Sequence, residues 1–239
     1  MRLNPANLKK DELIRRLNYH CQHGHDGLSH WECFNKEKGI KERIGYLDIE
    51  CSNLNADFGI VLSYCIKEDG VGSTTGPEDG EDVDEYCNKN GILHRVLTQR
   101  EIRNGTFDAK LLEQCAKDMK KFDRIITYYG ARFDIPFLRT RSIHFDLDFP
   151  LYREVKHTDA FDVVKRKLKL HRRSLAVVCD FFDVPSKGHR LNPEIWQKCL
   201  SGDKAALQWV LMHNVEDVIS TELAWHKIEK YARLTDTSI

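Results

Sequence analysis

The sequence predicts an α/β fold in which a mixed five-stranded sheet is flanked by helices, and three observations lead to that prediction. The chain has 239 residues, 41% hydrophobic and 31% charged, which is enough to bury one sizeable core. Three apolar runs with strand character follow one another early in the chain, as in a set of hairpins. Helical and strand patterns then alternate, which is typical of strands joined by crossover helices.

The first three strands are predicted from apolar runs that contain β-branched and aromatic residues. They cover residues 43–51 (RIGYLDIEC), 58–67 (FGIVLSYCIK) and 92–99 (ILHRVLTQ). Between the second and third runs lies an acidic stretch, residues 77–85, which is Gly-rich and has no hydrophobic period. We expect this stretch to be a flexible loop between strands.

Helices and strands alternate in the second half of the chain. Helical spacing covers residues 110–122, a strand follows at 124–130, and Pro136 fits the first turn of the next helix. A fifth strand near 155–158 precedes a helix that begins at about Ala160. The remaining segments are predicted as helices, and they are 174–184 and the stretches that begin at Pro193 and Asp203.

Four carboxylates in three short segments form the most informative pattern of the chain. Asp48 and Glu50 stand two apart in the first predicted strand, so both side chains leave the same face of the sheet. Asp134 lies in YYGARFDIPFL, and Asp217 lies in the last predicted helix. Neighbouring carboxylates in a buried strand repel and lose hydration, which protonation or a bound cation relieves. Oxygen ligands suit Mg²⁺ and Mn²⁺ better than zinc.

A histidine stands beside this acidic pattern. His213 precedes Asp217 by four residues, so both project from one face of the predicted helix. An imidazole changes charge near neutral pH and is able to take a proton from a metal-bound water. Taken singly, each carboxylate also fits a helix cap, an ion pair or an exposed helix position. Their joint occurrence favours one metal site.

The neighbouring residues resemble the three motifs of the DEDD (DnaQ-like) 3′-to-5′ exonucleases of the ribonuclease H-like superfamily. The matching segments are Asp48-Ile49-Glu50, Phe133-Asp134 with Pro136 and Phe137, and His213-Asn214-x-x-Asp217. The chain is most similar to stand-alone YprB-like predicted nucleases, which share the text YxGxRFDxPFLxTR and HNxxDV. The resemblance extends over roughly residues 43 to 231 and implies a ribonuclease H-like sheet.

The resemblance also implies an activity, namely hydrolysis of DNA or RNA from the 3′ end by two Mg²⁺ or Mn²⁺ ions. Asp48 would bridge the two ions, Glu50 and Asp217 would complete one, and Asp134 would hold the other. His213 would orient or deprotonate the attacking water, or would hydrogen-bond a phosphate. Two alternatives stay open: an endonuclease of the same fold, and a non-catalytic adaptor that binds nucleic acid or a protein.

Several residues are candidates for contact with a nucleic-acid strand. Tyr129 and Phe133 offer rings on which a terminal base would stack, although aromatic residues at a strand end often belong to the core. The basic run 165–173 would neutralise phosphates, or would be a solvated helix end. A net charge of zero argues against tight unspecific coating of DNA. A polar loop adds three further candidates, Lys187, His189 and Arg190.

The N-terminal segment, residues 1–40, is predicted to be separate from a ribonuclease H-like exonuclease domain at 41–239. The text NYHCQHGHDGLSHWECF gathers thiols and imidazoles on a short Gly-containing loop, which suits a tetrahedral structural Zn²⁺. A turn with incidental histidines is the alternative. The preferred zinc ligands are Cys21, His25, His30 and Cys33, with His20 and His23 as further candidates.

The sequence carries no signal peptide that we recognise and no apolar stretch long enough to span a bilayer, so no membrane association is expected. Four of its eight cysteines lie inside apolar periodic segments, where a reduced core thiol is the ordinary interpretation. These four are Cys51, Cys65, Cys115 and Cys179. We therefore expect a cytoplasmic enzyme.

Overall fold

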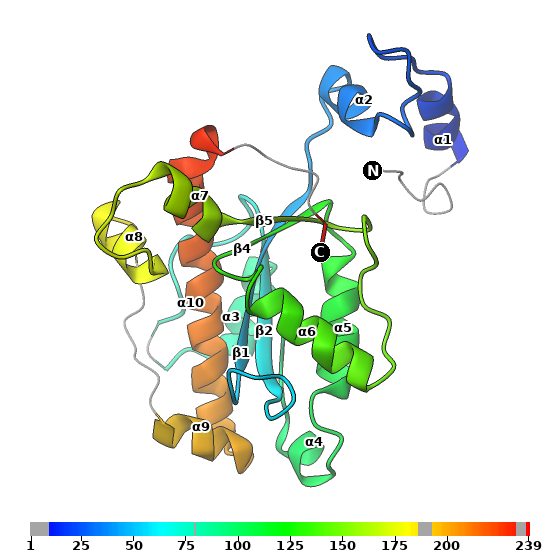
Figure 1. The fold of residues 1–239 in the computed structure, drawn as a ribbon. Helices are drawn as coiled ribbons and strands as arrows, with labels where there is room; N and C mark the ends of the chain where they lie inside the picture. Colours follow the sequence, from blue (N-terminus) through cyan, green and yellow to red (C-terminus); the bar gives the residue numbers. More distant parts are fainter. Residues whose placement is uncertain (1–9, 79, 186–192, 233–237) are drawn as a thin grey trace.

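The computed structural model describes residues 10–78, 80–185, 193–232 and 238–239, and it confirms the predicted α/β class (Figure 1). Five strands form one mixed sheet in the order β3-β2-β1-β4-β5. The strands are β1 (Ile44–Cys51), β2 (Val61–Glu68), β3 (Leu93–Val96), β4 (Arg124–Thr127) and β5 (Lys156–Asp159).

The pairing of the strands puts β1 at the centre of the sheet. β1 is antiparallel to β2 and parallel to β4, while β2 pairs antiparallel with β3 and β4 pairs parallel with β5. Parallel strands end at the same edge of a sheet. The turn that follows β4 and leads to Asp134 therefore starts at the edge where β1 ends.

Helices cover both faces of the sheet (Figure 1). α5 and α6 lie on one face, and α3, α7, α8 and α10 lie on the other. The ten α-helices of the described residues are α1 (Lys10–Leu17), α2 (Trp31–Glu37), α3 (Val83–Asn90), α4 (Gln99–Arg103), α5 (Ala109–Met119), α6 (Asp134–His144), α7 (Ala160–Lys167), α8 (Leu175–Phe181), α9 (Pro193–Leu200) and α10 (Lys204–Ile228).

The alternation of side chains along β1 separates the two faces. Leu47 and Ile49 pack in the core that contains α5 and α6, whereas Tyr46 packs in the core that contains α10. Because successive residues of a strand point to opposite faces, Asp48 and Glu50 share the face of Tyr46. Both carboxylates are thereby directed toward α10.

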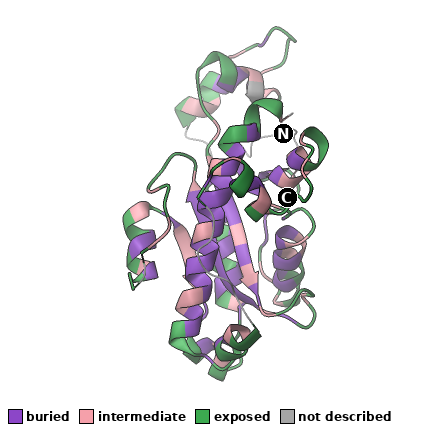
Figure 2. Cartoon of the chain, turned by 90° about the vertical axis from the view of Figure 1, so that its left-hand side faces the viewer, coloured by how far each residue is buried: buried purple, intermediate pink, exposed green. Residues whose placement is uncertain are grey.

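α10 is a central helix of the molecule rather than a surface helix. It spans 25 residues and is buried along most of its length, with Val215 and Val218 fully buried. Figure 2 shows the buried residues running along both this helix and the strands beneath it. A helix that is apolar nearly all round is held on several sides. α10 is therefore a rigid support for any side chain that it directs toward β1.

The acidic stretch at residues 77–85 differs from the prediction, because its last three residues are the start of a helix rather than part of a flexible loop. α3 begins at Val83, and the Asp82 side chain caps it by accepting a hydrogen bond from Glu85 N at 2.9 Å. Gly91, with a φ of +68°, ends the helix in the left-handed conformation. Acidic residues in a first helical turn interact favourably with the helix dipole. The acidity is thus a helix-start signal.

The predicted core thiols are confirmed. Four cysteines of the apolar segments are buried, namely Cys51, Cys65, Cys115 and Cys179. The eight cysteines all belong to the described part of the chain, and they form no disulfide. In the same part of the chain, no helix combines the length and apolar character that crossing a bilayer requires.

Candidate functional sites

Asp48 is held by two hydrogen bonds that connect β1 to β2 through α10. Asn214 Nδ2 on α10 donates to Asp48 Oδ2 at 2.5 Å, and Ser63 Oγ on β2 donates to Asn214 Oδ1 at 2.8 Å. The Asn214 side chain is fully buried, so its amide fixes the carboxylate relative to both α10 and β2. Sequence reasoning assigned no role to Asn214, although an amide inside an apolar helix beside His213 was a usable signal.

Glu50, His213 and Asp217 converge on the same side of the sheet. Their ligand atoms all lie within 4.8 Å of one another, and His213 Nε2 is 3.8 Å from Glu50 Oε1. His213 and Asp217 stand one turn apart on α10, and both are largely buried. Glu216 lies on the other side of the imidazole, 4.0 Å from its Nδ1. The structure thus places a histidine between carboxylates at the end of β1.

Asp134 reaches β1 from the first turn of α6. Its Oδ1 accepts a hydrogen bond at 3.1 Å from Ile49 N, the backbone amide between the two acidic residues of the strand. Asp134 is the first residue of the helix rather than its N-cap, which is Phe133. Burial, together with the nearby charges of Asp159 and Asp217, raises the pKa of the Asp134 carboxyl to about 7. A bound cation would relieve this repulsion.

Asp159 at the end of β5 organises the turn beside the site. Its carboxylate accepts hydrogen bonds from the backbone amides of Tyr129 at 2.8 Å, Ala131 at 3.1 Å and Phe161 at 3.0 Å. The last of these caps α7. The first holds Tyr129 in a left-handed conformation, with a φ of +72°. Asp159 therefore acts through the backbone and sets the path of the chain toward α6.

Two adjoining hollows open next to the carboxylates. Asp48 and Asp217 line the first, a cavity of about 330 Å³ whose other lining residues are Tyr128, Ser174, Leu175, Ala176, Cys179 and Ser220. The second has a volume of about 460 Å³ and is lined by Tyr128, Tyr129, Phe161, Arg172, Arg173, Ser174 and Leu175. Three residues are common to both linings, so the acidic cavity continues into a hollow of aromatic and arginine side chains.

The predicted substrate residues have different places. Tyr129 is 45% exposed and lines the second hollow, next to Arg172 and Arg173 of the basic run. Phe133 packs instead against the core, with its ring centroid 5.7 Å from that of Phe137. The remaining candidates, Lys187, His189 and Arg190, lie outside the described residues.

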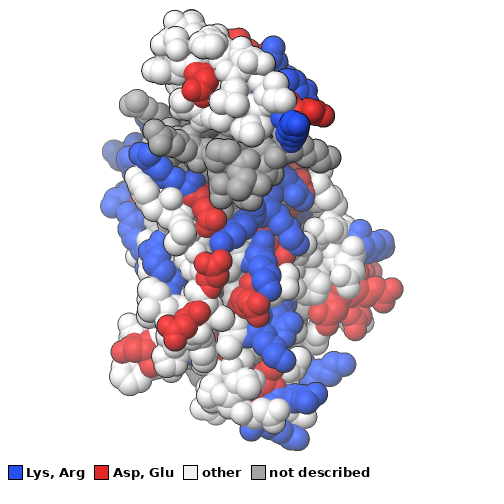
Figure 3. Space-filling view, turned by 90° about the vertical axis from the view of Figure 1, so that its right-hand side faces the viewer, with Lys and Arg blue, Asp and Glu red and all other residues white. Residues whose placement is uncertain are grey.

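The opposite face of the molecule carries mixed charge. Figure 3 shows this face, over α5, with Lys and Arg side chains interspersed with Asp and Glu. Three lysines here pair with carboxylates of the chain, and these pairs are Lys117–Glu113 at 2.6 Å, Lys120–Glu154 at 3.3 Å and Lys121–Asp118 at 2.7 Å. Lysines that already pair with carboxylates contribute little to the binding of phosphates. The hollow beside Arg172 is the better candidate for binding phosphates.

The donor set beside β1 fits divalent cations that prefer oxygen. Carboxylates arrive from β1, α6 and α10, and at Asp134 burial and the neighbouring charges disfavour the ionised form. Mg²⁺ and Mn²⁺ take such ligands, with waters completing the coordination.

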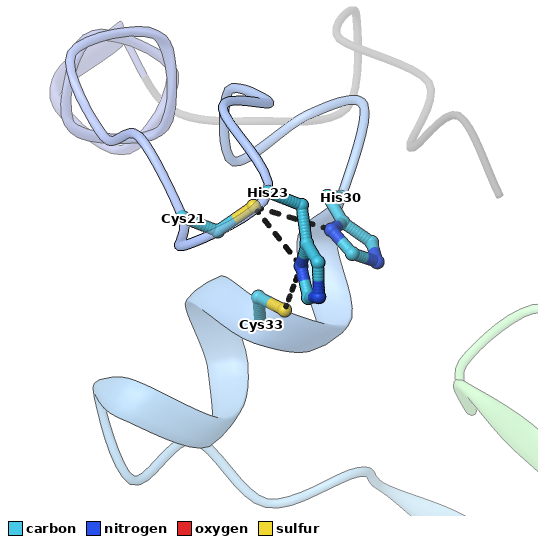
Figure 4. A group of neighbouring side chains, drawn as sticks. All are labelled: Cys21, His23, His30 and Cys33. Atoms are coloured by element: carbon cyan, nitrogen blue, oxygen red, sulfur yellow. Dashed lines mark hydrogen bonds between the residues drawn. The ribbon is translucent and has the colours of Figure 1, made fainter.

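The N-terminal segment holds a second group of ligand side chains, which Figure 4 shows. Its members are Cys21, His23, His30 and Cys33. The group contains His23 where the sequence predicted His25. The physical reason is a tight turn: Cys21 N donates to His25 O at 3.0 Å, and Gly24 adopts a φ of +78°. This turn directs the His23 ring toward the two sulfurs, while the His25 ring lies edge-on beside His30.

Comparison with known proteins adds a family and a fold. A family model described as the RNase_H superfamily matches residues 86–227, more than half of the chain. The solved structure of the family B DNA polymerase from the hyperthermophilic archaeon Pyrobaculum calidifontis is similar, with a TM-score of 0.52 and 18% sequence identity. The similarity covers 80% of this chain and 25% of the polymerase chain, so this chain spans about a quarter of that protein's length. No protein with a curated description matches.

Proposed function

The chain belongs to the RNase H superfamily, and from that membership we propose that it is a metal-dependent nuclease that removes nucleotides from the 3′ end of a nucleic-acid strand. The observation that carries the proposal is the convergence of acidic side chains from β1, α6 and α10 next to one histidine. The DEDD subtype, the likeness to YprB-like nucleases and the 3′-to-5′ direction rest on the resemblance of the three sequence motifs.

The proposed metal ligands are Asp48, Glu50, Asp134 and Asp217, which would hold two Mg²⁺ or Mn²⁺ ions. Bound there, such ions lower the pKa of a water molecule and stabilise the charge that develops on the leaving oxygen. The chain's own contribution is to hold these carboxylates in place before substrate arrives. Asn214 fixes Asp48, and the backbone amide of Ile49 fixes Asp134.

His213 is the proposed proton-handling group of the site. Its Nε2 lies 3.8 Å from Glu50 Oε1 and its Nδ1 lies 4.0 Å from Glu216 Oε2, so carboxylates stand on both sides of the ring. From this position, on a helix that is buried along most of its length, the imidazole would orient or deprotonate a water beside the ligands.

The second hollow supports a nucleic-acid substrate. Tyr129 and Phe161 stand edge to face with their ring centroids 4.9 Å apart, and Arg172 and Arg173 line the same wall. Aromatic faces stack on bases of any sequence, and guanidinium groups pair with phosphates. Since this hollow adjoins the cavity of Asp48, a single strand lying in it would present a phosphodiester to the carboxylates.

The direct test is to incubate 5′-labelled single-stranded DNA, duplex DNA and RNA of one sequence with the protein, in Mg²⁺ and separately in Mn²⁺. We expect products shortened stepwise from the 3′ end, and no products when the 3′ end is blocked. Cleavage of a strand whose 3′ end is blocked would contradict exonuclease activity and indicate an endonuclease. Binding of the strands without cleavage in either metal would contradict the proposed activity and favour an adaptor.

A further inference from the structure

Four ligand atoms of the N-terminal segment lie at the separations that one tetrahedral ion requires. Cys21 Sγ is 3.2 Å from His30 Nδ1 and 3.7 Å from His23 Nδ1, and Cys33 Sγ is 3.7 Å from His23 Nδ1 (Figure 4). All four ligand atoms lie within 4.8 Å of one another.

These separations match zinc coordination. With Zn–S bonds of about 2.3 Å and Zn–N bonds of about 2.0–2.1 Å, a tetrahedron places sulfur and nitrogen ligands about 3.5 Å apart. The three observed separations lie on both sides of that value. The His23 nitrogen is 3.7 Å from each of the two sulfurs, as a ligand shared in one coordination sphere would be.

The apolar core of this segment is too small to account for its structure. Among the described side chains of residues 10–40, Cys21 and Phe34 are the buried apolar ones. Tyr19 packs edge-on against Phe34 at 5.1 Å, and the Arg16 guanidinium lies over the same ring at 4.4 Å. Segments below about 40 residues usually need a metal, a disulfide or a partner to fold. α1 and α2 also lie apart from the helices that cover the sheet (Figure 1).

We propose that Cys21, His23, His30 and Cys33 bind one structural Zn²⁺, and that this ion ties the loop after α1 to α2 in a small unit that precedes β1. Two thiolates and two imidazoles are the ligands of closed, four-coordinate structural zinc sites. Because such a site is not formed in the unfolded chain, the binding free energy contributes directly to folding. The proposal agrees with the predicted division between residues 1–40 and 41–239, which stays a prediction.

The test measures zinc in the purified full-length chain by elemental analysis and then replaces it with Co²⁺. We expect one zinc per chain, released by a thiol-blocking mercurial, and a cobalt spectrum with the thiolate charge-transfer and visible bands of a tetrahedral S₂N₂ site. His23→Gln and Cys33→Ser should lose the metal. The matched control, His25→Gln, should retain it, as should Asp48→Ala at the distant carboxylates.

Proteolysis of the parent protein gives an independent readout, free of variants that fail to fold. Removal of zinc by a chelator should speed cleavage within residues 10–40 by about tenfold or more, and return of zinc should reverse the effect. A parent chain that holds neither zinc nor cobalt would overturn the proposal. Retention of zinc by His23→Gln together with its loss in His25→Gln would overturn the ligand set.

Discussion

Asn214 on α10 fixes the position of the Asp48 carboxylate on β1. Its amide accepts from Ser63 and donates to Asp48, and no water reaches it because the side chain is fully buried. Outer partners of metal ligands orient those ligands, and their loss typically lowers activity or metal affinity by about 10–100-fold. Asn214 is therefore a positioning residue for the proposed reaction.

Replacing Asn214 by Ala should lower the cleavage rate by about 10–100-fold and raise the Mg²⁺ concentration that gives half-maximal rate. The reason is that Asp48 loses its fixed orientation while its charge remains. Gln208→Ala is the matched control, since this amide lies on the same helix and donates to Asp84 instead. An unchanged Mg²⁺ dependence in Asn214→Ala would show that the amide has only a structural role.

Asp134 should lower the free energy of unfolding of the metal-free protein at neutral pH. Its folded-state pKa of about 7 exceeds the ordinary value of 3.8, so the folded state holds a proton that the unfolded state releases. Stability then falls as the pH rises from about 4 to about 7. Asp134→Asn should stabilise the metal-free chain at pH 8 by about 1–3 kcal/mol, and by less at pH 5.

The check is thermal unfolding of both proteins in chelator at the two pH values. Asparagine keeps an oxygen that is able to accept from Ile49 N, so the variant changes the charge and little else. A variant that is less stable than the parent at pH 8 would contradict the argument from burial and repulsion.

At the scale of elements, β5 carries a group that makes the fold sensitive to acid. His157 bonds to Thr127 Oγ1 of β4 through Nε2 at 2.9 Å. Burial, together with the positive charges of Arg124 and Arg139, lowers the His157 pKa from 6.5 to about 4. Between about pH 6.5 and pH 4, His157 therefore binds a proton in the unfolded chain but not in the folded chain. Stability is lost as the pH falls through this range.

His157→Gln should remove this loss, which amounts to about 3 kcal/mol between pH 6.5 and pH 4. The amide is able to keep the bond to Thr127 but does not titrate. Urea unfolding of the parent, of His157→Gln and of the exposed control His171→Gln across that range is the measurement. Equal pH slopes in the parent and in His157→Gln would refute the prediction.

The segment that follows α7 should bind phosphates. Arg172→Ala with Arg173→Ala should weaken binding of a single strand and reduce the steepness of its salt dependence by about one to two counterions. Arg100→Ala, exposed on α4, is the control for a change of charge alone. Binding should be measured by fluorescence anisotropy in Ca²⁺, at several salt concentrations. If the salt dependence of binding is unchanged in the double variant, the nucleic-acid strand does not contact Arg172 and Arg173.

The helices and strands that could be predicted from the sequence are those with a regular apolar pattern. The central strand and α10 have long, regular apolar patterns, and the pairing of Asp48 with Glu50 and of His213 with Asp217 follows from their periods. The start of α3 was not predicted, because its acidic residues were interpreted as part of a solvent-exposed loop and not as the first turn of a helix.

Features that depend on distant contacts or local turns could not be predicted in the same way. The role of Asn214 requires Ser63, which lies 151 residues earlier in the chain. The exchange of His25 for His23 in the N-terminal group requires the left-handed turn at Gly24. Sequence spacing alone carries neither piece of information.

At the scale of the whole molecule, the order of the sheet explains how the site forms. β1 lies between β2 and β4, so Asn214 and His213 of α10 meet it over one face and Asp134 of α6 meets it near its end. Three segments that are far apart in the sequence thus deliver carboxylates to one edge. The site is a property of the folded chain, and local unfolding of α10 would abolish it.

The most direct measurement is the initial rate at which a labelled single-stranded oligonucleotide is cut in Mg²⁺ by the parent, by Asp48→Ala and by Asp217→Ala. Glu113→Ala, on α5 at the opposite face, is the matched control. We predict that either site variant loses at least about 1000-fold in rate, which corresponds to about 4 kcal/mol of barrier, while the control cuts normally. Cleavage by Asp48→Ala at the parent rate would contradict the carboxylate site.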